Sequence, residues 1–276
     1  MEDLITKKKQ ILSVKELPTL PEVLNEVTRM IEEDRFSQEE IAKVISKDQS
    51  LTAKILKMVN SPIYGFPRRI STVQHALVLL GLNVVKGLII STTVFDMMTK
   101  AMKGMWEHSV GCATICSLIA KEVGFENPEE FSIAGLLHDI GKVIVAVQLP
   151  DSYEKINQLV KEKDISYREA EEEVLGFSHS RINLWISDYW NLPLNLKEGL
   201  TYHHKPVLAK HYPEFAHVVH IGDFLTKLFG IGFGGDDQVP KLYIESLKFL
   251  KISLKKLEKI LDFLSDNIEE IKGISL

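Results

Sequence analysis

The chain has 276 residues and a formal net charge of −5, with 45% hydrophobic and 26% charged residues, a balance typical of a soluble globular protein. Acidic and basic residues are interspersed, so no broad basic surface is expected, and nonspecific nucleic-acid binding is disfavoured. No segment approaches the roughly 18 consecutive apolar residues of a membrane span, and the N-terminus lacks the apolar stretch of a secretory signal. We therefore expect a cytoplasmic protein with no membrane partner.

The first 99 residues show almost only the 3.6-residue period of amphipathic helices. Ser37 with Glu40 and Ser71 with Gln74 have the spacing of capping boxes, which predict two helix starts. The segment NSPIYGFPRRI (60–70) contains two prolines and a glycine without a clear period, and it predicts an ordered loop. These patterns predict a helical lobe over residues 14–99, in which β-branched runs leave room for one short strand.

Residues 100–230 predict a second helical lobe. A helix that begins at Pro128 is expected to run through FSIAGLLHDIGKVIVAVQ to residue 148, because proline and acidic residues suit a first helical turn. Two further helices are predicted in 151–176, and the glycine-rich segment IGFGGDDQ (231–238) predicts a surface loop. Residues 231–276 then add C-terminal helices that pack on the core. The fold class predicted is all-α, with two intimately packed lobes.

The two cysteines, Cys112 and Cys116, are four residues apart in one predicted helix. This arrangement is not that of a disulfide framework, and reduced thiols are expected.

The stretch GLLHDIGKV (135–143) places polar side chains in an apolar segment. His138 and Asp139 offer an imidazole nitrogen and a carboxylate oxygen, which suit a divalent ion such as iron, manganese, nickel or zinc. Lys142 follows one turn later and lies on the same side. The alternative is a hydrogen-bonded pair kept for structural reasons. Two residues do not complete a metal site, so further ligands are needed.

Other predicted helices can supply these ligands to a common centre, which could hold one ion or two. Asp223 lies in an otherwise apolar helix, where a buried carboxylate without a partner costs several kcal/mol. Surface or core roles are expected for His75, His211, His217 and His220. The candidate ligands in addition to His138 and Asp139 are His108, His179, His203, His204 and Asp223.

This order of residues resembles the HD superfamily of helical metal-dependent phosphohydrolases. The segments LPTLPEVLNEV, DQSLTAKILKMVNSPIYGF and ISTVQHALVLLGLNVVKGLII narrow the resemblance to the HDOD domain, the HD-related output domain of bacterial signalling proteins. The resemblance covers roughly residues 14–225 and implies an all-α fold, a regulatory setting and a bacterial origin. Many HDOD domains have lost the metal ligands and act as non-catalytic modules, but this sequence retains them.

By the same resemblance, the seven His and Asp residues match metal ligands, with Asp139 as the bridge if two ions are present. Lys142 matches the lysine that contacts a substrate phosphate. Two departures stand out: Gly104 occupies a position where catalytic relatives often carry a glutamate ligand, with Glu107 pointing elsewhere, and no GYP-containing loop follows His204.

Two functions therefore remain open. The first is a signalling output module that binds a divalent metal for stability or regulation and acts through a partner protein. Segment 60–70 is then a candidate interaction region, with a packed connector as the alternative. The second is an active phosphohydrolase or phosphodiesterase on a nucleotide or small phosphoester, with Lys142 and Asp139 as catalytic groups.

Overall fold

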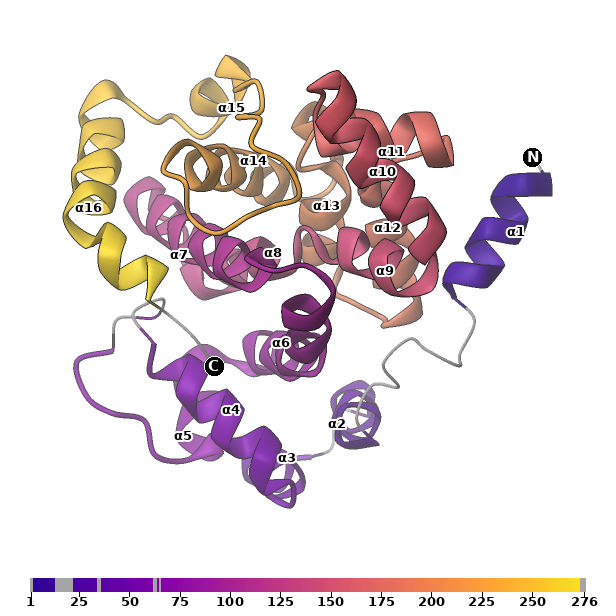
Figure 1. Cartoon of the computed structure of the whole chain (residues 1–276). Helices are drawn as coiled ribbons and strands as arrows, with labels where there is room; N and C mark the ends of the chain where they lie inside the picture. Colours follow the sequence, from indigo (N-terminus) through magenta and orange to yellow (C-terminus); the bar gives the residue numbers. More distant parts are fainter. Residues whose placement is uncertain (1, 13–21, 34–35, 62–63, 65, 274–276) are drawn as a thin grey trace.

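Helices follow one another along the chain in the computed structural model, which describes residues 2–12, 22–33, 36–61, 64 and 66–273 (Figure 1). These residues contain no strand, which confirms the all-α class. The short strand allowed for the first lobe is not found within the described ranges.

The first lobe is built from helices whose starts follow the capping rules. Ser37 and Glu40 form the predicted capping box. The second predicted box is wrong by one residue, because Thr72 and not Ser71 accepts the N–H of His75. Thr72 has the extended backbone, φ −136° and ψ 149°, that an N-cap residue requires. The helices are α2 (Glu22–Glu32), α3 (Gln38–Ser46), α4 (Gln49–Val59), α5 (Val73–Leu80) and α6 (Leu82–Ala101).

The segment 60–70 joins α4 to α5 and is anchored at several points. The side chain of Asn60 accepts the N–H of Ile70 at 2.7 Å and donates to its carbonyl at 2.8 Å. Tyr64 is buried, and its hydroxyl accepts from Ser132 of the second lobe at 3.4 Å. These contacts favour the packed connector, while residues 62, 63 and 65 of the predicted loop lie outside the described residues.

The helix α6 joins the two lobes and packs on α4, α8 and α9. A Cβ atom at Gly87 would lie 2.3 Å from the side chain of Ile133, so the backbone of α6 rests directly on α8. By length and composition α6 could cross a membrane, but 69% of its apolar window is buried inside the molecule. Residues 128–148 and 150–163 pass the same test only as a pair, which is bent by 116°. Burial against both lobes identifies α6 as a core helix.

The second lobe surrounds the buried pair α7 and α8, which α14 covers (Figure 1). Small residues allow this close approach: a Cβ at Gly222 would lie 2.5 Å from the sulfur of Cys116. Cys112 and Cys116 are buried free thiols in this interface. The elements are α7 (Met105–Val123), α8 (Pro128–Leu137), α9 (Ile140–Gln148), α10 (Pro150–Lys163), α11 (Tyr167–Leu175), α12 (His179–Tyr189), α13 (Leu194–Tyr202), the 3₁₀ turn η1 (Pro206–Leu208) and α14 (Pro213–Leu228).

The remaining helices lie on the outside of the second lobe. The helix α1 (Glu2–Ile11) contacts α9, and α16 (Leu254–Lys272), preceded by α15 (Ile244–Phe249), packs against α7. The predicted loop 231–238 is irregular, and Gly232 and Phe233 are exposed, but Gly234, Gly235 and Asp236 are buried. The N–H of Phe233 donates to the carbonyl of Gly104, and the backbone of Gly232 lies against that of His108. This loop therefore covers the start of α7.

Candidate metal centre

The candidate centre begins where α8 passes into α9. The single helix predicted to run to residue 148 is wrong at this point, because it is interrupted at His138 and Asp139. The side-chain oxygen of Asn183 on α12 accepts the N–H of Gly141 at 2.9 Å, and its amide nitrogen donates to the carbonyl of His138 at 2.5 Å. The N–H of Lys142 turns to the carbonyl of Asp139. One asparagine thus replaces the two backbone hydrogen bonds that a continuous helix would make here.

The interruption directs two adjacent side chains toward one point. Nε2 of His138 lies 3.3 Å from Oδ2 of Asp139. Nδ1 of His138 donates to the carbonyl of Gly135 at 2.7 Å, and Nδ1 of His203 donates to that of Leu200 at 2.8 Å. Nε2 of each ring therefore faces the cluster. Burial opposes a charge on His138, but the carboxylate of Asp139 raises the pKa of that ring well above its usual value, so a bound metal ion would take the place of the proton on its Nε2.

A first group of ligand atoms joins α7, the α8–α9 junction and α14. Nε2 of His108 lies 3.3 Å from Oδ1 of Asp223 and 3.5 Å from Oδ2 of Asp139. Nε2 of His138 lies 3.6 Å from the same oxygen of Asp223. Ligand atoms at about 2.1 Å from a tetrahedral ion are about 3.4 Å apart. The spacing of this group therefore matches that of ligands around one ion.

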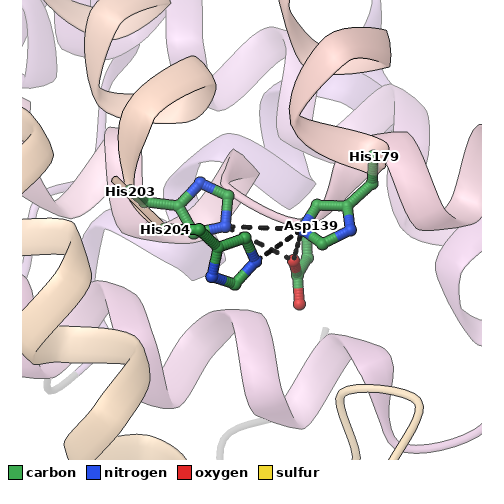
Figure 2. Close-up of side chains that lie close together, drawn as sticks. All are labelled: Asp139, His179, His203 and His204. Atoms are coloured by element: carbon green, nitrogen blue, oxygen red, sulfur yellow. Dashed lines mark hydrogen bonds and ion pairs between the residues drawn. The ribbon is translucent and has the colours of Figure 1, made fainter. Parts of the chain in front are cut away.

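A second group lies beside it and includes the other carboxylate oxygen of Asp139 (Figure 2). Nε2 of His179, at the start of α12, is 3.3 Å from Oδ1 of Asp139. It is also 3.4 Å from Nε2 of His203 and 2.9 Å from Nε2 of His204, both of which follow α13. The seven predicted ligands thus come together in two groups, and Asp139 offers one oxygen to each.

The strongest sign that a cation fits is a set of buried polar atoms without partners. Nε2 of His108, Nε2 of His138, Oδ1 of Asp139 and Oδ1 of Asp223 are inaccessible to solvent and have no hydrogen-bond partner in the described chain. Unpartnered buried groups of this kind cost about 1 to 3 kcal/mol each. Four of them converge here, and each is a ligand type for divalent transition metals.

The ionisation states of the side chains in the cluster also favour the binding of a cation. Burial opposes ionisation of Asp139, but the charges of His138 and Lys142 hold its pKa well below the usual range. Burial, reinforced by the charge of His138, lowers the pKa of His203 to about 3. Burial also lowers the pKa of His179, next to Lys142, well below its usual value. Neutral imidazoles and ionised carboxylates are the forms that bind metals.

Glu171 is a site residue that the sequence reasoning missed. Its Oε2 accepts the N–H of His179 at 2.8 Å and the Nδ1–H at 2.5 Å, which leaves Nε2 of that ring for a cation. Burial raises the pKa of Glu171 well above its usual value, against the opposing hydrogen bond from the His179 backbone. A signal was present in the sequence, since Glu171 shares the buried face of α11 with Tyr167 and Leu175.

Lys142 is almost fully buried, and its ammonium group is hydrogen-bonded within the protein. Its ammonium donates to Oδ2 of Asp139 at 2.6 Å and to the carbonyl of Gly234 at 2.8 Å. The loop 231–238 therefore holds this lysine against the cluster. The same loop explains Gly104, which has φ 87° and would place a Cβ atom 2.8 Å from Phe233. A glutamate ligand at that position would be strained and would displace the loop.

Two cavities reach the cluster, and the larger one also borders Asp236 and Gln238 of this loop. One, of about 580 Å³, is lined by His179 and His204 and extends to Lys142. The other, of about 490 Å³, also borders His204. They share Arg168, Glu172 and His204, so the second group of ligands lies next to a groove open to solvent.

The histidines left out of the ligand set lie elsewhere. His75 and His211 are exposed, whereas His217 and His220 are buried. Nδ1 of His220 donates to the carbonyl of His203 at 2.9 Å, and its Nε2 accepts the N–H of Tyr243. His220 thus supports the backbone of a candidate ligand without facing the centre itself.

Comparisons of the sequence and of the fold identify proteins that are similar to this chain. The model of the HDOD domain family matches residues 17–206. An HDOD domain protein of unknown function from Geobacter sulfurreducens is 27% identical, with a TM-score of 0.78 over 99% of this chain and 96% of that one. A protein from Shewanella amazonensis SB2B, described as a candidate phosphohydrolase, is 21% identical and has the same fold, with a TM-score of 0.71 over 99% and 98% of the two chains. An uncharacterised protein from Treponema pallidum is 26% identical over 73% of this chain, which spans only 39% of that relative.

Proposed function

Because the chain belongs to the HDOD family, we propose that it is a bacterial signalling output module that holds one or two divalent metal ions and acts through a partner protein. The observation that supports the metal is the convergence of four buried ligand atoms without partners at Asp139 and its neighbours. Iron, manganese, nickel and zinc suit these nitrogen and oxygen donors. The Treponema relative is much longer than this chain, as expected if modules of this kind also occur within longer proteins.

The ligand set of the proposal assigns His108, His138 and Asp223 to one ion and His179, His203 and His204 to the other, with Asp139 shared. Ligands from α7, α12, α13 and α14 and the α8–α9 junction would then be tied together by the bound ions. Ions that bind only the folded chain stabilise it in proportion to their occupancy. The ions thus provide a physical route by which metal supply could regulate this lobe.

Metal analysis of the purified protein tests the proposal. We expect about one or two equivalents of a transition metal in the wild type, fewer in His138→Ala, and a lower melting temperature for that variant because a ligand is lost. His75→Ala is the matched control, since His75 is exposed on α5. A wild-type protein without metal after incubation with each of the four ions would contradict the proposed site.

A metal-dependent phosphohydrolase is the second candidate function, and the groove beside His179 and His204 favours it. Bound ions would supply a water of lowered pKa and neutralise phosphate oxygens. In this chain Asp139 would be the ligand shared by the two ions, and Lys142 would hold its carboxylate in place through their 2.6 Å contact. A screen against phosphoesters and cyclic dinucleotides tests the activity. Turnover that Asp139→Ala abolishes would establish an enzyme, and no turnover with any of the four metals would leave the signalling role alone.

A further inference from the structure

A pocket of about 490 Å³ continues from His204 away from the candidate metal centre. Its wall comes from α11, the first turns of α12, the end of α13 and the segment that follows α13. Because this pocket and the larger cavity share Arg168, Glu172 and His204, they form one groove that starts at the ligands and extends outward.

Two cations line the outer part of this groove without a protein partner. Arg181 lies two residues after His179, and Lys205 directly follows His204. Neither side chain makes a hydrogen bond or ion pair within the described residues, whereas Arg168 beside them is neutralised by Glu172 at 3.0 Å. Unpaired cations on a convex surface are ordinarily just solvated. Here both lie in one concave wall, next to two candidate ligands.

The same wall offers further groups for an organic ligand. Ser180 and Thr201 also line the pocket, and their buried hydroxyl oxygens have no hydrogen-bond partner among the described residues. Phe177, Leu184 and Leu208 add apolar surface. Few polar groups set among apolar and aromatic side chains are typical of sites that bind small organic molecules.

From this juxtaposition we propose that the groove binds an organic phosphate with a second anionic group: the phosphate lies at the metal centre, the apolar body on the pocket wall, and the second anion on Arg181 and Lys205. The inference rests on the proposed metal site, because the ions hold the first phosphate. Arg181 and Lys205 are then residues that determine ligand selectivity and do not take part in metal binding.

Two aromatic probes test this selectivity: phenyl phosphate, with one phosphate, and 1,4-phenylene bisphosphate, with a second phosphate across the ring. In calorimetric titrations of the manganese-loaded protein, we expect the bisphosphate to bind about tenfold more tightly, as charge-assisted hydrogen bonds allow. In the double variant Arg181→Ala, Lys205→Ala, the preference should fall to about twofold, with phenyl phosphate binding and metal content unchanged. The matched control is Arg69→Ala, Lys255→Ala, which removes the same charges from exposed positions elsewhere.

Equal affinity for the two probes in the metal-loaded wild type would overturn the inference, as would failure of both to bind or a preference that survives in the double variant. Metal content is measured on the same samples. Protein without metal contradicts the proposed metal site, whereas metal-loaded protein without a preference contradicts only the assignment of Arg181 and Lys205.

Discussion

At the scale of single residues, the candidate centre depends on side chains that no ion would touch. Glu171 fixes the ring of His179 through two hydrogen bonds to one carboxylate oxygen. His220 holds the backbone of His203. Such outer partners set the tautomer and orientation of a ligand, and replacing one typically lowers metal affinity by about 10- to 100-fold.

The variant Glu171→Gln tests this role. The amide keeps the size of the side chain, but its NH2 group can turn toward Nδ1 of His179 where the carboxyl offers only an acceptor oxygen, so we expect metal affinity to fall by about tenfold or more. Competition with a chelator of known affinity measures it. Glu173→Gln is the matched control, because Glu173 lies on the same helix and pairs with Lys163 at the surface. Equal affinities of the two variants would contradict the role given to Glu171.

At the scale of elements, hydrogen bonds join α13 to the segment after η1, on either side of His203 and His204 in the chain. The carboxylate of Glu198 on α13 accepts the backbone N–H groups of Lys210, His211 and Tyr212 at 3.1, 2.9 and 2.6 Å. Burial opposes ionisation of Glu198, but these hydrogen bonds outweigh it and lower its pKa. A carboxylate with a lowered pKa in the folded state stabilises the fold above its unfolded pKa and loses that effect as the pH falls through the folded value.

For Glu198→Gln we therefore expect a loss of about 1 to 2 kcal/mol in the free energy of unfolding at pH 7. The difference from the wild type should begin to narrow as the pH falls below about 4.5, where Glu198 of the unfolded chain takes up a proton before the folded carboxylate does. Urea unfolding followed by circular dichroism between pH 7 and pH 4 measures it. A difference that stays constant over this range would show that the charge is not involved.

Elements also show which parts of the molecule can be predicted from sequence. The all-α class and the start of α3 follow from periodicity and a capping box, since both are local. The interruption of the helix at residue 138 depends on Asn183, which lies 45 residues further along the chain. The loop 231–238 is recognisable from its glycines, but its packing over Gly104 is a tertiary contact. The ligand roles of the seven grouped residues remain a prediction.

At the scale of the whole molecule, the two lobes meet where α6 rests on α8. We propose that the lobes divide near residue 100, at the end of α6; the contact at Gly87 leaves no space for a side chain. The lobe with the NSPIYG segment is thus held rigidly against the lobe with the candidate centre.

Gly87→Ala tests the interface. The added methyl group would lie 2.3 Å from Ile133, so we expect a loss of about 1 to 3 kcal/mol in the free energy of unfolding. Thermal and urea unfolding measure this loss. The same change in an Ile133→Ala background should cost less, because the crowding atoms are gone. An equal cost in the two backgrounds would mean that the lobes do not meet as described.

The asparagine at the α8–α9 junction has a consequence for the order of folding. Residues 128–148 carry no local signal that stops a helix at 138, and by themselves they favour a continuous one. Asn183 supplies the alternative hydrogen bonds only after α12 has docked. We therefore expect the motif to acquire its functional shape late, as a product of tertiary assembly, and a peptide of residues 128–148 to bind metal poorly even when it is fully helical.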